Sequence, residues 1–212
     1  MPALELSRSD RKRQAIMAAA TSMFLSRGYD GTSMDDVAGL AEVSKPTVYK
    51  HFADKQGLFN AIILATTDQI DAVVHLVVDA LADTPDLEQD LTVFASRFLS
   101  ALMQPDVLRL RRLVIANADR FPEMGRTWYE RGFERVLATL AGQFQRLQQL
   151  GLLEVDDTQV AADHFVGLLL SIPVNRVMFS GDAARCSEAE LARHAAAAVR
   201  TFLRAYAPRS GA

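Results

Sequence analysis

Five polar side chains close together in the sequence could make hydrogen bonds and ion pairs with an anionic partner. They are Lys45, Thr47, Tyr49, Lys50 and His51. Ammonium, hydroxyl and imidazole groups hold phosphate oxygens, and from a short helix they can reach the edges of bases. All four lysines of the chain lie in its first 55 residues. Residues 1–55 hold eight Lys/Arg and seven Asp/Glu, whereas residues 56–212 hold 15 Arg and 19 Asp/Glu, so a slightly basic segment precedes an acidic one.

Catalytic chemistry is not indicated by the sequence. It contains no Gly-rich phosphate loop, no HExxH motif and no nucleophile elbow. The histidines at positions 51, 75, 164 and 194 are far apart in sequence, and the single Cys186 has no zinc-site spacing around it. We therefore expect no cofactor and no metal, and an enzyme remains the least favoured alternative.

The composition indicates an ordinary globular protein, with 50% apolar and 23% charged residues among 212. The first residues lack the apolar stretch of a signal peptide. No run of 18 consecutive apolar residues occurs, and the longest largely apolar stretch, residues 165–174, is interrupted by Gly167, Ser171 and Pro173. The sequence therefore predicts a cytoplasmic protein without a membrane partner.

Apolar residues recur at helical spacing throughout, which predicts an all-α chain of about nine helices. Ser33, Ser44, Asp54 and Ser187 are predicted helix caps, and Pro173 should kink or interrupt its helix. The expected helices cover residues 8–26, 33–40, 44–52, 55–82, 87–103, 106–118, 122–150, 158–179 and 187–206. We predict an N-terminal three-helix head, residues 1–55, and a C-terminal helical body, residues 56–212, that binds a ligand and dimerises.

Two short predicted helices, residues 33–40 and 44–52, are joined by Ala41-Glu42-Val43. Such a pair is typical of a helix-turn-helix, in which the second helix reads DNA. The stretches Thr32–Ala38 and Ala41–Phe59 strongly resemble the TetR/AcrR family of bacterial regulators, and Phe24–Tyr29 is similar to the end of that family's first helix. Glu42 departs from the family, because many members carry glycine there; a left-handed conformation would cost Glu ~1 kcal/mol relative to Gly.

The resemblance implies a role in DNA binding for particular residues. Tyr49, Lys55 and His51 would contact phosphates, and Lys45 and Thr47 would lie nearest to base edges. The complete predicted DNA-binding set is Ser33, Ser44, Lys45, Pro46, Thr47, Tyr49, Lys50, His51 and Lys55. In this set Pro46 would contact a thymine methyl group and Ser33 a phosphate. The basic cluster Arg8, Arg11, Lys12 and Arg13 would supply an arm near the groove.

The resemblance also implies a two-fold dimer, formed by the last two predicted helices. The predicted interface residues are Phe165, Leu168, Leu169, Ile172, Leu191, Ala195, Ala198, Val199 and Phe202. Two subunits would then make a four-helix bundle. The alternative is that these residues form only an intramolecular core.

A small-molecule pocket in the body is a further expectation from the resemblance. Its predicted lining is His75, Phe94, Phe98, Met103, Asn117, Phe121, Trp128, Tyr129, Phe133 and Asn175, although a filled core is an equal alternative. The stretches Phe121–Met124 and Trp128–Tyr129 resemble an AefR-like subgroup. The predicted function is a homodimeric regulator, foremost a repressor, that binds a palindromic double-stranded DNA operator through residues 33–52 and is released by a small apolar or amphipathic effector. The alternative is a constitutive DNA-binding regulator without an inducer.

Overall fold

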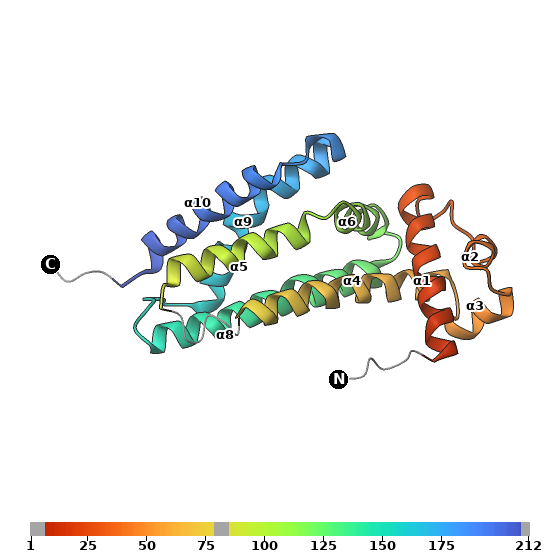
Figure 1. The fold of residues 1–212 in the computed structure, drawn as a ribbon, viewed down its shortest axis with the longest axis horizontal. Helices are drawn as coiled ribbons and strands as arrows, with labels where there is room; N and C mark the ends of the chain where they lie inside the picture. Colours follow the sequence, from red (N-terminus) through yellow and green to blue (C-terminus); the bar gives the residue numbers. More distant parts are fainter. Residues whose placement is uncertain (1–6, 79–84, 209–212) are drawn as a thin grey trace. The chain divides into compact units, whose positions relative to one another are not determined.

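The computed structural model describes residues 7–78 and 85–208, and every regular element in these ranges is helical (Figure 1). The elements are α1 (Arg8–Arg27), α2 (Met34–Leu40), α3 (Lys45–His51), α4 (Lys55–Val78), α5 (Leu87–Leu102), α6 (Pro105–Asn117), α7 (Pro122–Trp128), the π-helix η2 (Tyr129–Glu134), α8 (Arg135–Gln149), α9 (Thr158–Ser180), the 3₁₀-helix η3 (Asp182–Ala184) and α10 (Glu188–Tyr206). The all-α prediction is confirmed. The expected continuation of the fourth helix over residues 79–82 lies outside the described residues.

The predicted caps begin their helices, with one difference in chemistry. The Ser33 hydroxyl accepts from the Asp36 amide at 3.1 Å, and Asp54 Oδ1 accepts from the Gly57 amide at 2.7 Å. Ser187 and Glu190 form a complete capping box at the start of α10. Ser44 occupies the cap position of α3, but its side chain makes no cap hydrogen bond.

One helical run was predicted over residues 122–150, and the structure divides it. A single π-helical turn, Tyr129–Glu134, separates α7 from α8. Such a turn inserts an extra residue into a helical run. Counting α7, η2 and α8 as one run leaves nine α-helical runs among the described residues, in agreement with the prediction.

The chain divides into two compact units, and their boundary differs from the predicted boundary at residue 55. The first comprises residues 1–66 together with residues 109–128, and the second comprises residues 67–108 together with residues 129–212. α1, α2, α3 and α7 therefore belong to the first unit, and α4 and α6 each contribute to both. The second unit contains α5, η2, α8, α9 and α10 in full.

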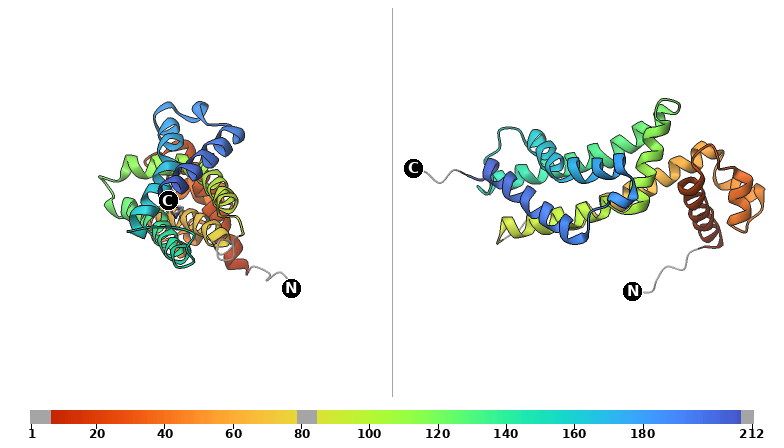
Figure 2. Two further views of the ribbon diagram at one scale, coloured as in Figure 1. Left: turned by 90° about the vertical axis from the view of Figure 1, so that its left-hand side faces the viewer. Right: turned by 90° about the horizontal axis from the view of Figure 1, so that it is seen from above.

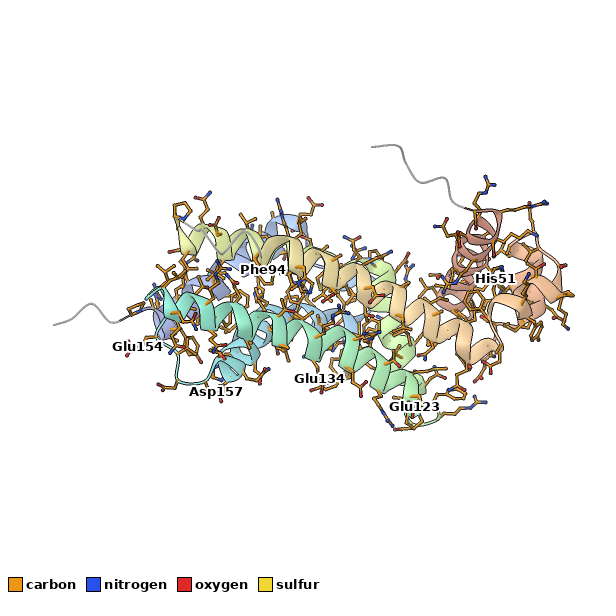
Figure 3. All side chains as sticks on the ribbon, turned by 90° about the horizontal axis from the view of Figure 1, so that it is seen from below. His51, Phe94, Glu123, Glu134, Glu154 and Asp157 are labelled. Atoms are coloured by element: carbon orange, nitrogen blue, oxygen red, sulfur yellow. The ribbon has the colours of Figure 1, made fainter. Side chains whose placement is uncertain are left out.

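The second unit has a core of large aromatic side chains. Phe94, Phe144, Phe165 and Phe202 are each at most 1% exposed, and Phe165 lies 5.8 Å from Phe144 and 5.0 Å from Phe202 between ring centroids. Figures 1 and 2 both draw α10 beside α5 and α9 in this unit, and Figure 3 labels Phe94 among these helices. The core therefore joins α5, α8, α9 and α10.

Two helical segments, Lys55–Leu76 and Thr158–Ser180, are long and apolar enough to cross a membrane by length and composition alone. However, 44% of the apolar window in the first and 50% in the second is buried inside the protein. Partial burial of this kind is also found in the core helices of proteins outside membranes. These two segments are therefore weak evidence for a membrane span.

Candidate nucleic-acid interface and candidate dimer surface

The helix-turn-helix rests on a small apolar core. Ile16 and Phe24 of α1, Val37 of α2 and Val48 of α3 are at most 1% exposed. Phe24 also packs edge-on against Phe59 of α4, with 4.9 Å between ring centroids. Because the inward face of each short helix is buried in this way, its remaining residues are turned toward solvent.

The turn between α2 and α3 has the backbone conformation that the sequence called into question. Glu42 has a φ of 53°, in the left-handed region that glycine occupies without steric cost. The Glu42 amide donates to Gly39 O at 3.2 Å, and the Val43 amide donates to Ala38 O at 3.1 Å. These two bonds form a Schellman motif that ends α2, with Glu42 in the position usually taken by glycine.

The start of α3 shows why Ser44 is not a side-chain cap. Pro46 lies in the first turn and has no N–H group to offer. The Thr47 amide bonds to the backbone oxygen of Ser44 at 2.8 Å, and the two hydroxyl oxygens of Ser44 and Thr47 lie 2.8 Å apart. A pair of hydroxyl groups is thus presented where α3 begins.

The predicted DNA-binding residues of α3 lie on its outer faces. Lys45, Pro46, Tyr49 and Lys50 are exposed. Thr47 and His51 are half-buried; Figure 3 labels His51. The helix therefore brings together the polar set that the sequence placed on it.

Lys45 makes an ion pair that the sequence did not reveal. Its Nζ lies 2.8 Å from Asp35 Oδ1 and 2.9 Å from Asp35 Oδ2 at the start of α2. This hydrogen bond and the charge of Asp35 raise the pKa of Lys45 above its usual value. A base edge that binds Lys45 must therefore compete with Asp35.

Lys55 is engaged inside the first unit. Its ammonium donates to Tyr29 O at 2.9 Å and to Thr32 O at 3.1 Å, and it lies 4.5 Å from the centre of the Tyr29 ring. Two of its three N–H groups thus hold the connection between α1 and α2. Burial is the largest cause that raises the pKa of the Tyr29 hydroxyl, followed by the charge of Asp54.

The other residues predicted to contact DNA are Ser33 and the basic residues between positions 8 and 13. Ser33 is hydrogen-bonded to α2, and the basic residues lie in α1. The Ser33 hydroxyl donates to Asp36 Oδ2 at 2.8 Å while it caps α2. The basic cluster of residues 8–13 lies in the first turns of α1, and the Arg13 guanidinium is 5.3 Å from the centre of the Phe52 ring. In the described residues this cluster is helical.

Arg120 and Phe121 belong to the same unit as the helix-turn-helix and contact the connection between α1 and α2. Arg120 Nη1 lies 2.8 Å from Asp30 Oδ1, and the ring of Phe121 lies 5.0 Å from that of Tyr29. The Arg120 guanidinium also stacks 4.9 Å from the Phe121 ring. Sequence reasoning missed these contacts, since nothing in the spacing connects positions 30 and 120.

The predicted ligand-binding residues are divided between the two compact units. Asn117, Phe121 and Trp128 lie in the first unit, and the other seven lie in the second. In the second unit Phe94, Phe98 and Met103 are packed in its core, whereas Tyr129 and Asn175 are exposed. Half of the His75 side chain is exposed, with Nε2 3.6 Å from Asp71. The Asn117 amide donates to Leu113 O of its own helix at 2.8 Å.

Buried polar residues of the second unit were missing from that prediction. Thr67, Asp71 and Gln143 are 1%, 6% and 8% exposed. Asp71 Oδ2 lies 3.1 Å from Arg135 Nη2, and Gln143 Nε2 is buried without a hydrogen-bond partner among the described residues. A buried amide without a partner is unusual, and composition alone gives no signal for it.

Most residues of the predicted dimer interface are buried inside one protomer. Seven of its nine residues are at most 9% exposed inside one protomer: Phe165, Leu169, Leu191, Ala195, Ala198, Val199 and Phe202. They form the core that joins α9 and α10 to the rest of the second unit. Leu168 and Ile172, 38% and 69% exposed, are the two that face outward.

An apolar stripe runs along the outside of α9. Leu168 and Ile172 are one turn apart and share a face, Val160 is exposed two turns before Leu168, and Phe179 is 87% exposed near the end of the helix. Beside this stripe a groove of about 870 Å³ is lined by α9 and α10. Its lining is Asp163, His164, Gly167, Leu168, Ser171, Ile172, His194, Thr201, Phe202, Ala205 and Tyr206.

A helix-turn-helix with a polar outer face is the arrangement by which DNA-binding transcriptional regulators place a reading helix in the major groove. Comparison with known proteins identifies the family of this chain. Residues 16–62 match the bacterial regulatory proteins of the tetR family, and residues 89–208 match the C-terminal domain of AefR-like transcriptional repressors. The second match covers more than half of the chain, so the chain belongs to the TetR family, whose fold is that of regulators rather than of enzymes.

Solved structures of this family align with nearly the whole chain. A chain from Mesorhizobium loti assigned to the TetR family is 48% identical, with a TM-score of 0.90, over 96% of this chain and 100% of its own length. The flavonoid-responsive regulator FrrA is 28% identical, with a TM-score of 0.74, over 94% of this chain and 99% of its own.

Curated relatives match shorter stretches. The transcriptional activator FasR of Mycolicibacterium smegmatis is 36% identical over 42% of this chain and 39% of its own length. The transcriptional repressor TetR of Mycobacteroides abscessus is 31% identical over 49% of this chain and 54% of its own. The matched stretches thus span about half or less of these two curated relatives.

Proposed function

We propose that this chain acts in the cytoplasm as a homodimeric repressor that binds a palindromic DNA operator and leaves it when a small molecule binds. The observation that carries the proposal is the exposed polar face of α3, held by a buried core on a chain whose residues 89–208 match AefR-like repressors. Because the net charge of the chain is −3, one N-terminal head attracts DNA only weakly, and the affinity for DNA should depend on the two heads of a dimer.

The roles of individual residues follow from their positions on the helix-turn-helix. Lys45 and Thr47 at the start of α3 read base edges, and Lys45 exchanges Asp35 for a base when DNA binds. Tyr49 and His51 hold phosphates from the later turns of α3. Lys55 contributes its remaining N–H to a phosphate while its other two donate to Tyr29 and Thr32.

The dimer forms through the outer face of α9 and the neighbouring face of α10. Leu168 and Ile172 project from α9 beside a groove whose α10 wall includes the small residues Thr201 and Ala205. A two-fold interface places the same surface of both copies in contact, so the stripe of one copy can fill the groove of the other. Exposed apolar stripes of this kind mark interaction sites in soluble proteins.

The effector is a small apolar or amphipathic molecule bound in the second unit. Support comes from FrrA, which is named as a flavonoid-responsive regulator and aligns with 94% of this chain. Within the second unit the buried Gln143 amide offers a hydrogen-bond donor without a partner among the described residues. Effector binding selects a form of the dimer whose heads no longer fit two half-sites.

Selection of bound DNA from a random pool, followed by gel-shift assays, tests the proposal. The selected sites should be inverted repeats whose centres are about 34–36 Å apart or a multiple of that distance. Affinity should fall steeply as salt rises, because phosphate contacts release counterions. Recovery of no sequence preference, or of single half-sites only, would contradict the proposal.

Activation is a second candidate function, favoured by one observation. The relative FasR is named as an activator and is 36% identical over 42% of this chain. Both functions require the same DNA contacts, so binding assays do not separate them. Transcription in vitro from a promoter that carries the selected site does: a repressor lowers transcript yield and an activator raises it.

A further inference from the structure

Helix α9 continues through a proline in its interior. The helix runs from Thr158 to Ser180, and Pro173 lies within it. Proline has no N–H group, so the carbonyl four residues earlier, Leu169 O, loses the donor that any other residue would supply. The sequence predicted that Pro173 would kink or interrupt this helix, and the structure shows no interruption.

A histidine of α10 supplies the missing donor. His194 Nε2 lies 3.0 Å from Leu169 O and 3.0 Å from Leu168 O. Carbonyl oxygens only accept hydrogen bonds, so Nε2 carries the proton and donates to both. The side chain therefore bridges α10 to α9 at the carbonyl that Pro173 leaves without its helical donor.

The bridge lies within the groove that we assign to the dimer. His194 lines this groove from α10, and Leu168 and Ile172 line it from α9. Leu168 supplies both one of the bridged carbonyls and one of the outward apolar side chains. The position of His194 thus fixes α9 relative to α10 where the partner would dock.

We propose that His194 is a positioning residue of the dimer surface: by donating to the carbonyl freed by Pro173, it sets the α9–α10 groove in the shape that a second copy fits. This inference rests on the proposed dimer. His194 and Pro173 are linked through the Leu169 carbonyl. Because residue 173 is a proline, this carbonyl needs the donor that His194 supplies. An N–H group restored at position 173 would remove that need.

The test is a double-mutant cycle on the full chain, with the dimer dissociation constant measured by sedimentation. His194→Ala should weaken dimerisation by about tenfold or more, because the part-buried Leu169 carbonyl then has neither a helical donor nor the histidine, and a docked second copy would exclude water from it. Pro173→Ala in the same chain should restore the dissociation constant to within about threefold of that of the Pro173→Ala single variant. His194→Gln, which keeps a donor of similar reach, should dimerise like the unmodified chain.

His164 provides the matched control. It lines the same groove, and its Nδ1 lies 2.6 Å from the Tyr206 hydroxyl rather than from a carbonyl near the proline. Any loss of dimerisation in His164→Ala should therefore persist when Pro173→Ala is added. Rescue of both histidine variants alike would overturn the link between His194 and Pro173.

Two further results separate this inference from the proposed function. If the unmodified chain is a dimer but His194→Ala and His194→Gln dimerise equally well, the role of His194 is overturned and the dimer stands. If the unmodified chain stays monomeric at every concentration, both the dimer and this role are overturned. Circular dichroism of each variant shows whether the helical content of the chain is retained. If His194→Ala unfolds, the dissociation constants of His194→Gln and of the double variant decide whether His194 has the proposed role.

Discussion

The left-handed conformation of Glu42 predicts that this chain can be stabilised by one substitution. A non-glycine residue in the left-handed region costs about 1–2 kcal/mol, because Cβ approaches the following carbonyl oxygen. Glycine avoids this cost but loses about 0.5–1 kcal/mol more backbone entropy on folding. Glu42→Gly should therefore raise the free energy of unfolding by roughly 0.5–1 kcal/mol.

The fluorescence of Trp128 is a suitable reporter for this measurement. It is the only tryptophan of the chain, it is 7% exposed, and it belongs to the same compact unit as Glu42. With a slope near 2 kcal/mol per molar urea, the expected gain moves the midpoint of urea unfolding upward by about 0.25–0.5 M.

Two matched variants separate backbone strain from charge. Glu42→Gln removes the negative charge and keeps the strained backbone, so its midpoint should equal that of the unmodified chain. The urea midpoint of Glu42→Asn should lie between those of the unmodified chain and of Glu42→Gly, because asparagine tolerates the left-handed region better than most residues. A midpoint raised as much by glutamine as by glycine, or left unchanged by glycine, would refute the reasoning.

Three further predictions concern the DNA and dimer surfaces. Asp35→Asn should tighten DNA binding measured by fluorescence anisotropy, because it releases Lys45 and removes a negative charge from the DNA-facing side; weaker binding would contradict this competition. Lys45→Ala should change base preference, whereas Tyr49→Phe and Lys55→Ala should weaken binding to all sequences alike, and equal losses on every operator variant for all three would contradict these roles. Ile172→Glu should leave the protein monomeric in sedimentation, because it places a charge in the apolar stripe; a dimer of unchanged affinity would count against the assigned surface.

The elements of the fold were largely predictable because their ends carry local chemical signals. Ser33, Asp54 and Ser187 begin helices for reasons contained in three or four neighbouring residues. The strain at Glu42 was also predictable, since the resemblance indicated a position for glycine. The π-helical turn after Trp128 was not, because one extra residue in a helical run leaves no mark in composition.

The faces of α9 were not predictable, for a physical reason. This helix is apolar on almost every side, so its sequence pattern does not distinguish core from surface. Phe165 and Leu169 are therefore alike in type to Leu168 and Ile172, yet the first two are buried and the last two are outside. Only the packing against α8 and α10 decides between them.

In the candidate DNA site, contacts between residues far apart in the sequence could not be predicted either. The basic residues themselves could be named from their order in the chain, but their present partners could not. Asp35 lies ten residues from Lys45, and Thr32 lies 23 residues from Lys55. Both contacts exist because the turns bring these segments together, and spacing in an isolated helix does not predict them.

The contacts of Asp30 and Tyr29 with Arg120 and Phe121 have a consequence for how the molecule is made. The unit that contains the helix-turn-helix also includes residues 109–128, so it is discontinuous in the chain. Synthesis proceeds from the N-terminus, and this unit acquires all its parts only after residue 128 has left the ribosome. A transplanted N-terminal segment would lack the ion pair and the ring contact across this interval. Chimeric regulators built by exchanging heads should therefore carry residues 109–128 with the head.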